Sequence, residues 1–409
     1  MSFICHLTQE LHINKFSIIN EVVVSNTNNI MVATKIGVIG SGYVGFELIK
    51  VLSQGYKNKD CSIVAYDIYE PRAKYVDEIT DSNVKASSNH NILENCDAYM
   101  ICVPTPDDEN NRPDESCLRA AKKLVETYAR ENSVLILESS VCIGDTRAIF
   151  GDLREKKIFV AFSPERVDPG RVYPPAHTIH KLIGGIDKES LDAAYAIYEH
   201  AFDNLVRVSS PEVAEFSKLY ENTYRLMNIA FANQMADAAR KVGLDPDEIY
   251  HAVKTKPFGL DGPFTHGLGA GGPCLPSNAL HLLHTCDVPI LKTASDACAS
   301  RPVEKANEFA RFASEKGITK VVVSGLTFKK NVSTTIASPA MAFTMELMKL
   351  MDIVVHDPLV NKECLPEINF TTNIESDLES AECVLLFVAH DHPDTDIVKK
   401  YSQKFIWSP

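Results

Sequence analysis

The sequence predicts an α/β protein in which two doubly wound, parallel-sheet domains are joined by a long central helix. Short apolar strands alternate with helical segments over residues 31–208, and the same alternation returns over 303–409. Such alternation is typical of parallel sheets covered by helices. Between the two regions a nearly continuous helical pattern runs from about Pro211 to Val253. We expect residues 1–30, which end in the polar stretch SNTNNI, to form an N-terminal extension.

The individual strands follow from short apolar runs. In the first region the predicted strands are KIGVIG, SIVAYDI, DAYMICVP and SVLILESS, and FELIKVLSQ between the first two has helical spacing. In the last region they are KVVVSGL, DIVVHDP and ECVLLFVAHD. Parallel sheets of this kind bind ligands at the carboxyl ends of their strands, so we expect the site there.

Composition narrows the kind of partner and compartment. The chain has 409 residues, 45% of them hydrophobic, and a net charge of −13. This charge argues against nucleic acid and against an anionic membrane surface, because binding to phosphate groups needs concentrated Lys and Arg. The eleven cysteines form no CxxC pair, which favours a reducing compartment over a disulfide framework or a zinc site. The sequence shows neither a membrane span nor a secretory signal, so we expect a cytoplasmic protein.

A glycine-rich loop directly after the first strand predicts a Rossmann-like dinucleotide site. Its six residues are Gly40, Ser41, Gly42, Tyr43, Val44 and Gly45, in the pattern GxGxxG. The glycines permit a tight turn, close approach of pyrophosphate and close helix packing. Asp67 ends the next strand, where a carboxylate accepts ribose hydroxyls and repels a 2′-phosphate, so NAD is favoured over NADP. The alternative is a glycine-rich turn with a capping aspartate.

A long Gly/Pro loop contains the segment GAGGPCLPSN at 269–278, with Cys274 between two prolines. A thiol can attack an aldehyde to give a thiohemiacetal, which becomes a thioester on loss of hydride and is then cleaved by water. A cysteine beside NAD can thus take an alcohol to an acid. The alternative is a turn that contains a cysteine and carries no chemistry.

Such a thiol needs a donor to hold an oxyanion and a base to guide water. Lys218 and Asn222 stand at i and i+4 of the long helix and share one face. From spacing alone, however, a solvated lysine and a surface asparagine are favoured. Glu165 follows the strand IFVAF and could activate water, or it could be a solvated loop charge; spacing leaves both open.

Seven motifs, in order, resemble the UDP-glucose/GDP-mannose dehydrogenase family. They span about residues 33–395 and read IGSGYVG, ICVPTP, ESSVCIGDT, SPERVDPG, EFSKLYENTYRLMNIAFANQM, GAGGPCLP and GLTFKKN. The resemblance implies a homodimer that uses NAD to oxidise the C6 alcohol of a nucleotide sugar to a carboxylate in two steps. It also implies that residues 209–302 form the dimerisation region with the cysteine loop, and that 303–409 bind the nucleotide sugar.

The resemblance assigns roles to single residues. It implies that Cys274 is the nucleophile and that Lys218 and Asn222 hold the oxyanion and substrate. Glu165 matches the carboxylate tied to substrate and thioester hydrolysis, and Asn278 falls at a catalytic position. The implied cofactor contacts beyond the glycine loop are Asp67, Arg72, Thr105 and Ser140. The further implied substrate contacts are Arg166, Phe264, Gly267, Gly269, Gly271, Phe328 and Lys329.

The subclass rests on two short segments. PERVDPG and the IGG of HKLIGGIDKES resemble the branch that acts on UDP-N-acetylhexosamines, such as UDP-N-acetylglucosamine or UDP-N-acetylmannosamine. UDP-glucose is the alternative substrate. A two-electron hydroxy-acid dehydrogenase is a third possibility, but simple hydride transfer needs no thiol.

Three positions depart from the family pattern. Asn278 replaces an aspartate, and an amide cannot take a proton from thiol or water. Ile336 replaces an arginine that reaches NAD, and His266 replaces a proline. The first two departures motivate an alternative function, a catalytically impaired relative that binds a nucleotide sugar or pairs with an active subunit. His281 and His284 lie one turn apart, but no matching ligand pattern accompanies them, and we expect no metal site.

Overall fold

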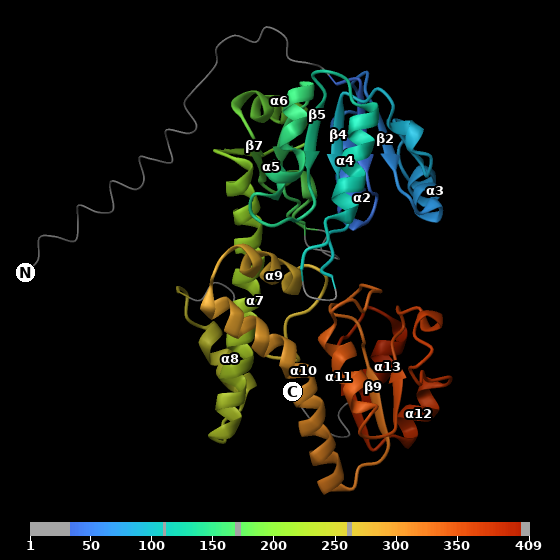
Figure 1. Cartoon of the computed structure of the whole chain (residues 1–409). Helices are drawn as coiled ribbons and strands as arrows, with labels where there is room; N and C mark the ends of the chain where they lie inside the picture. The colour runs from blue at the N-terminus through green and yellow to red at the C-terminus, as the bar shows by residue number, and fades with distance from the viewer. Residues whose placement is uncertain (1–32, 109–111, 168–172, 260–263, 402–409) are drawn as a thin grey trace, which may run out of the picture. The chain divides into compact units, whose positions relative to one another are not determined.

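The structure is a computed structural model, and it describes residues 33–108, 112–167, 173–259 and 264–401. The predicted extension at residues 1–30 lies outside this range. Figure 1 shows the large sheet with its helices, the long helix α7, and the smaller C-terminal sheet. Among the described residues, no helix combines the length and the apolar character needed to cross a membrane.

The first sheet has the strand order β3-β2-β1-β4-β5-β6-β7-β8. Its first six strands are parallel and follow the 3-2-1-4-5-6 order of dinucleotide-binding folds. β7 then pairs antiparallel with β6, and β8 is parallel to β7. The strands are β1 (Lys35–Ile39), β2 (Ser62–Tyr66), β3 (Val84–Ser87), β4 (Ala98–Ile101), β5 (Val134–Leu137), β6 (Phe159–Phe162), β7 (Lys181–Gly185) and β8 (Leu205–Val208).

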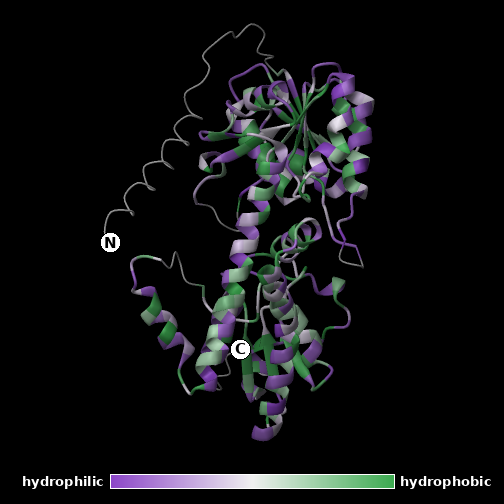
Figure 2. Cartoon of the chain, turned by 60° about the vertical axis from the view of Figure 1, so that its left-hand side comes forward, coloured by the Kyte–Doolittle hydropathy of each residue, from purple (hydrophilic) through white to green (hydrophobic). Residues whose placement is uncertain are grey.

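Helices cover both faces of this sheet, which explains why its central strands β4, β5 and β6 are apolar throughout. Met100 packs into the core on one face, with residues of α2 and α6, whereas Ile101 packs on the other, with residues of α4 and α5. Figure 2 shows the hydrophobic strands between helices of mixed hydropathy. The helices of this region are α2 (Tyr43–Gly55), α3 (Glu70–Ile79), α4 (Ser116–Tyr128), α5 (Asp145–Phe150) and α6 (Lys188–Tyr198), with short 3-10 turns η1 (His90–Leu93), η2 (Gly151–Lys156) and η3 (Ala176–Thr178).

The central helical region departs from the sequence prediction in one respect. The nearly continuous helix predicted from about Pro211 to Val253 is two helices: α7 spans Pro211–Lys241, and α8 spans Pro246–Lys254. Gly243 adopts a left-handed conformation with φ +77°, and the Asp245 side chain caps the start of α8 by accepting from the amide of Asp247. A glycine that ends one helix and an Asp-Pro pair that starts the next explain the interruption.

Two further helices lead to the second sheet. α9 (Leu275–Thr285) packs against α7, and α10 (Pro289–Lys316) contacts both. The second sheet has the order β10-β9-β11 with all strands parallel. It contains β9 (Val321–Ser324), β10 (Ile353–His356) and β11 (Cys383–Leu386), accompanied by α11 (Pro339–Leu347), η4 (Lys362–Cys364), α12 (Ile374–Ser380) and α13 (Pro393–Tyr401). Both predicted doubly wound regions and the long helix between them are therefore confirmed.

Candidate active site

The glycine loop between β1 and α2 has the geometry of a phosphate cradle. Gly40 has φ +88°, and a Cβ on Gly45 would lie 2.0 Å from the Gly40 carbonyl oxygen, so neither position accepts a side chain. A Cβ on Gly42, by contrast, would meet nothing within 4 Å. Open space beside Gly42, at the N-terminal end of a 13-residue helix, fits the pyrophosphate of NAD.

Asp67 and Arg72 hold this loop. The backbone amide and the hydroxyl of Ser41 both donate to Asp67 Oδ2 at 2.8 Å, and Arg72 Nε donates to the Ser41 carbonyl oxygen at 2.6 Å. Asp67 follows β2, which neighbours β1 in the sheet. Asp67 and Arg72, the residues predicted to contact the adenosine side of NAD, therefore lie next to the glycine loop. Their hydrogen bonds to Ser41 hold the loop in its conformation.

Thr105 and Ser140 meet across the next two strands. The Thr105 hydroxyl, after β4, donates to the carbonyl oxygen of Ser140, after β5, at 2.7 Å. β4 pairs with β1, whereas β2 lies on the other side of β1, so the strand order reverses at this place. Dinucleotides bind at such a reversal. The predicted cofactor residues thus share one edge of the sheet.

Cys274 stands at the N-cap of α9 and is exposed. A thiolate at a helix N-terminus is favoured by the helix dipole, and an exposed thiol is accessible to a substrate. The two glycines before it lie against the C-terminal region. A Cβ on Gly271 would clash with Pro339 at 2.3 Å, and one on Gly272, with φ +87°, would clash with Phe328 at 2.5 Å. The paired glycines let the cysteine loop approach the segment that contains predicted substrate residues.

Lys218 and Asn222 project from α7 toward the cysteine helix. Lys218 Nζ donates to the backbone carbonyl oxygen of Glu165 at 2.6 Å. Burial lowers the pKa of Lys218, while the negative charges of Cys274 as thiolate, Glu165 and Glu221 act in the opposite direction. Asn222 Nδ2 donates to Asn278 Oδ1 at 2.5 Å. The structure therefore gives both side chains specific partners, although spacing alone favoured solvated positions.

Glu165 turns its side chain toward the protein interior. Its Oε1 accepts from the amides of Arg166 and Val167 at 2.7 and 2.9 Å, and its Oε2 accepts from Lys181 Nζ at 3.2 Å. Burial alone would raise the pKa of the Glu165 carboxyl, but Lys181 and the two amides bring it below the usual value. The carboxylate is thus ionised and well supplied with donors, and it is the backbone carbonyl that reaches Lys218.

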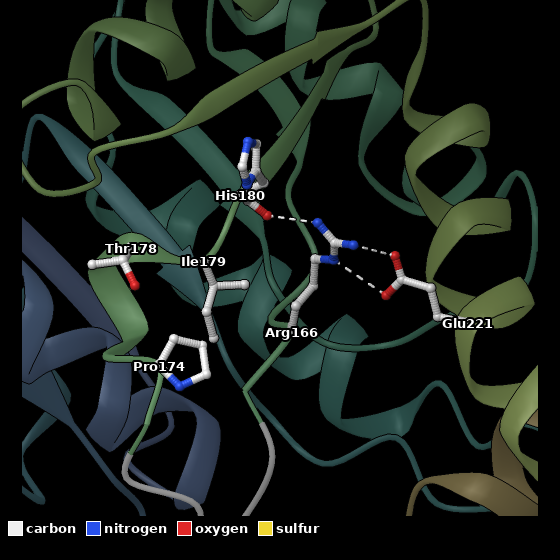
Figure 3. A pocket seen from close by; sticks show the side chains of 6 residues that line it. All are labelled: Arg166, Pro174, Thr178, Ile179, His180 and Glu221. Atoms are coloured by element: carbon white, nitrogen blue, oxygen red, sulfur yellow. Dashed lines mark hydrogen bonds and ion pairs between the residues drawn. The ribbon is translucent and has the colours of Figure 1, made fainter. Parts of the chain in front are cut away.

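Arg166 lies in the loop after β6 and lines a pocket of about 450 Å³ (Figure 3). Its guanidinium donates twice to Glu221 of α7, at 2.5 and 3.2 Å, and once to the His180 carbonyl oxygen at 2.7 Å. These contacts tie the loop after β6 to the long helix. The Arg166 guanidinium, predicted to contact substrate, therefore donates to Glu221 and to the His180 carbonyl oxygen in this structure.

The loop before the cysteine is held by residues that the sequence did not single out. Asn233 Oδ1 accepts from the amide of Gly267 at 2.7 Å, and Arg301 Nε donates to the Gly267 carbonyl oxygen at 2.6 Å. Arg301 and Lys305 of α10 also pair with Asp237 of α7. Nothing in their local spacing identifies Asn233 or Arg301 as loop anchors.

The remaining predicted positions lie in the loop before Cys274 and in the segment after β9. Phe264 and Gly269 lie in the same loop, and Gly269 has φ +130° next to the Cys298 carbonyl. Phe328 packs against Gly272, and Lys329 is half-buried beside it. His266 contacts Asp247 at 3.2 Å and Arg240 at 3.4 Å. Within the described residues, no cluster of His, Cys, Asp and Glu has the arrangement of a metal site.

The chain matches known proteins along most of its length. Three sequence profiles of one family match the chain in order: its NAD binding domain at residues 34–202, its central domain at 212–296 and its UDP binding domain at 322–407.

The chain is also similar to individual relatives. It is 30% identical over 384 residues to a UDP-N-acetyl-D-mannosamine dehydrogenase of Methanocaldococcus jannaschii. The aligned region covers 88% of this chain and 86% of the relative. It is 28% identical to an NDP-N-acetyl-D-galactosaminuronic acid dehydrogenase of Ralstonia nicotianae, with 87% and 90% covered. The solved structure of a UDP-D-ManNAc dehydrogenase from Pyrococcus horikoshii superposes with a TM-score of 0.76 at 26% identity, over 87% of this chain and 90% of that one.

A glycine cradle suited to NAD, an exposed cysteine near a half-buried lysine, and three family profiles in the expected order lead to one conclusion. The chain belongs to the UDP-glucose/GDP-mannose dehydrogenase family and is an NAD-dependent nucleotide-sugar dehydrogenase.

Proposed function

We propose that this protein oxidises the C6 alcohol of a UDP-N-acetylhexosamine to the uronic acid, in a four-electron reaction that passes through covalent adducts on Cys274. The observation that carries the proposal is the convergence of Cys274, Lys218 and the Asn222–Asn278 pair from α9 and α7. A thiol beside a cation and amide donors has the groups that acyl chemistry needs.

The reaction begins with loss of a proton and a hydride from the alcohol, which gives an aldehyde. NAD, when bound along the glycine loop, supplies the hydride acceptor for both oxidations. The Cys274 thiolate then adds to the aldehyde carbon, and the former carbonyl oxygen becomes an oxyanion. Lys218 and Asn222 stabilise that oxyanion by charge and by hydrogen bonding. The second hydride loss turns the thiohemiacetal into a thioester.

Water completes the reaction by cleaving the thioester, which releases the carboxylate and restores the thiol. In total, one alcohol, two NAD and one water give one carboxylate and two NADH with release of three protons. Asn278 occupies the catalytic position beside Cys274, and its amide cannot accept a proton. Glu165 has its carboxylate held by interior donors. We therefore assign hydrolysis as the slow step of this enzyme.

The substrate class rests on the C-terminal region and on the relatives. The UDP binding profile matches residues 322–407, and the relatives named above act, by their names, on N-acetylated hexosamine nucleotides or their uronic acids. The segment PERVDPG supports the same branch. UDP-glucose is the substrate to be compared first.

We also propose that the protein is a homodimer in the cytoplasm, with α7 at the interface. One helical stripe of α7 exposes apolar side chains at spacings of three, four and seven residues: Val213, Phe216, Tyr220, Tyr224, Phe231 and Met235. A contiguous apolar stripe of this kind is typical of a protein contact. The same helix turns Lys218 and Asn222 toward the site, so dimerisation would brace the catalytic helix.

A second candidate is a catalytically impaired relative that acts by binding a nucleotide sugar or by pairing with an active subunit. Two observations favour it. Asn278 is buried at the position of the missing base, and Ile336 leaves 63% of its surface exposed where the family has a cation for NAD. Binding of UDP-sugar without NADH formation, with turnover regained in Asn278→Asp combined with Ile336→Arg, would establish this candidate.

The test is incubation of the purified protein with NAD and a panel of UDP- and GDP-sugars. NADH is followed by absorbance, and products are identified by mass. The proposal predicts a UDP-N-acetylhexosamine as the best substrate and a uronic acid as the product. Absence of turnover with every UDP-sugar, or release of an aldehyde as the only product, contradicts it.

A further inference from the structure

A buried group of charged and polar side chains lies behind the candidate site, inside the first sheet domain. It consists of Glu138 after β5, Glu165 after β6, Lys181 at the start of β7 and Tyr198 at the end of α6. All four residues expose less than a tenth of their surface. We call these four residues the Lys181 cluster.

Lys181 is the centre of the cluster. Its Nζ donates to Glu138 Oε2 at 2.5 Å, to Glu165 Oε2 at 3.2 Å and to the Pro164 carbonyl oxygen at 3.3 Å. The Tyr198 hydroxyl donates to Glu138 Oε1. The ammonium therefore uses its donors on two carboxylates and one carbonyl, and each carboxylate has a further donor.

Such an arrangement is costly as a purely stabilising device. Buried ions lose their hydration, and an apolar group of similar size often serves stability as well. One cation also cannot neutralise two carboxylates. These costs point to a role for the cluster other than stabilisation of the fold.

We propose that Lys181 is a positioning residue for the reaction: it fixes the loop Pro164–Val167, whose backbone carbonyl at Glu165 orients the Lys218 ammonium toward Cys274. The inference rests on the proposed function, because it assigns a role within that reaction.

The chain of contacts runs in short steps. Lys181 holds the Pro164 carbonyl and the Glu165 carboxylate, and the other Glu165 oxygen is closed onto the amides of Arg166 and Val167. The loop then presents the Glu165 carbonyl to Lys218 Nζ at 2.6 Å. Lys218 lies one turn before Asn222 on α7. Asn222 contacts Asn278, one turn after Cys274 on α9, so the ammonium and the thiol lie on facing sides of the two helices. A shift of the loop therefore displaces the ammonium that steadies the oxyanion.

Lys181 itself is 2% exposed, and within the described part of the chain its hydrogen bonds reach the site residue Glu165 and the Pro164 carbonyl of this loop. It therefore acts on the reaction without contacting substrate. Removing it should lower kcat while leaving NAD binding unchanged, because the glycine loop lies after β1 and shares no contact with Lys181 in the described residues.

The experiment compares four variants of the full chain. Lys181→Met removes the ammonium but leaves two buried carboxyl groups. It is therefore paired with Lys181→Met/Glu138→Gln, which keeps the net charge of the cluster at the wild-type value above the Glu138 pKa of about 7, where the assays are run. Glu138→Gln alone keeps the Lys181–Glu165 contact. Tyr198→Phe removes another polar group from the same cluster without touching the loop, and it serves as the matched control.

The inference predicts that both variants lacking Lys181 lose about 100-fold in kcat, the effect of a small misplacement of a catalytic group. Their NAD affinity, measured by calorimetry, should stay at the wild-type value. Glu138→Gln and Tyr198→Phe should keep a kcat close to wild type. A kcat that is unchanged without Lys181, or reduced as much by Tyr198→Phe, overturns the inference.

A second readout separates this inference from the proposed function. The alkylation rate of Cys274 by iodoacetamide, followed by mass spectrometry of its peptide, reports the Lys218 charge without any turnover. The inference predicts slower alkylation in both variants lacking Lys181 and an unchanged rate in Tyr198→Phe. If the wild type forms no NADH but alkylation still depends on Lys181, the function fails and the positioning role stands.

Discussion

Asn222 Nδ2 donates to Asn278 Oδ1 at 2.5 Å, which joins the central helix α7 to the helix that follows Cys274. The contact fixes the helix of the nucleophile against the helix of Lys218. It also shows how Asn278 is used: its oxygen accepts a hydrogen bond, and its side chain has no proton-accepting group for water. An aspartate at this place could keep the contact with Asn222 and add a base.

We predict that Asn278→Asp speeds hydrolysis of the thioester by about 100-fold or more, the usual effect of a general base. The wild type should accumulate a covalent adduct on Cys274, visible as added mass in acid-quenched samples, and the variant should not. Asn278→Ala, which lacks both the acceptor and the base, is the control and should not gain rate. Faster turnover in the wild type than in Asn278→Asp would refute a slow, base-poor hydrolysis.

The charge of Lys218 predicts a pH dependence of catalysis. Burial lowers the pKa of Lys218. As pH rises, its ammonium group therefore loses its proton at a lower pH than that of an ordinary lysine. Since the oxyanion needs the cation, kcat/KM should fall on the alkaline side. In the Lys218→Arg variant the guanidinium stays charged across the alkaline range. The alkaline fall of kcat/KM should therefore disappear or move to higher pH in this variant, even if its kcat is lower.

Lys218→Met should reduce kcat by about 100- to 1000-fold, as for loss of one oxyanion donor. The measurement is kcat/KM between pH 7 and pH 10, with substrate and NAD varied separately. An alkaline fall that is identical in the wild type and Lys218→Arg would assign it to another group.

The Lys181 cluster predicts a pH dependence of stability. Burial raises the pKa of the Glu138 carboxyl to about 7, with Lys181 opposing and Glu165 adding to the shift. Tyr198 and Cys102 face it as well. A carboxyl with a raised pKa holds its proton more tightly in the folded state. Its contribution is therefore present below the unfolded value of 4.5 and is lost as pH rises to about 7.

This loss is on the order of 3 kcal/mol in the free energy of unfolding, from a shift of that size. Glu138→Gln should remove it, so the stability of the wild type should fall more steeply than that of the variant between pH 5 and pH 7. Denaturant unfolding at these pH values measures it. Glu131→Gln, at a surface ion pair with Lys157, is the control and should retain the wild-type slope. Parallel slopes for the wild type and Glu138→Gln would contradict the shift.

The exposed stripe on α7 predicts a dimer that a single charge can disrupt. Phe231 is 61% exposed in the chain by itself, so Phe231→Arg should place a charge in the interface and halve the mass measured by light scattering. Leu350→Arg, an equally drastic change at an exposed position outside the stripe, should leave the mass unchanged. A monomeric wild type at working concentrations would remove the proposed interface.

The dinucleotide-binding part of the structure could be predicted from the sequence, because its sequence pattern lies within one short segment. The loop Gly40–Gly45 and Asp67 form a contiguous strand–loop–helix–strand signature, and their contacts match it. The break between α7 and α8 was not predicted, because the helical pattern was followed across Gly243 and the Asp245-Pro246 pair that end one helix and start the next.

Other parts depend on contacts distant in sequence. Spacing placed Lys218 and Asn222 on one face of a helix, but it could not show that this face meets Glu165 and Asn278. Lys181 comes from β7, and its partner Glu138 follows β5, so only the sheet brings them together. The inward direction of the Glu165 side chain likewise follows from Lys181.

The second oxidation, from aldehyde to acid, is proposed to take place on the sulfur of Cys274, and the amount of NADH formed per sugar consumed tests this step most directly. Cys274→Ala is compared with Cys364→Ala, which removes the other cysteine that is exposed among the described residues. We expect two NADH per uronic acid for the wild type and for Cys364→Ala, and no uronic acid from Cys274→Ala. Full oxidation to the acid by Cys274→Ala would contradict it.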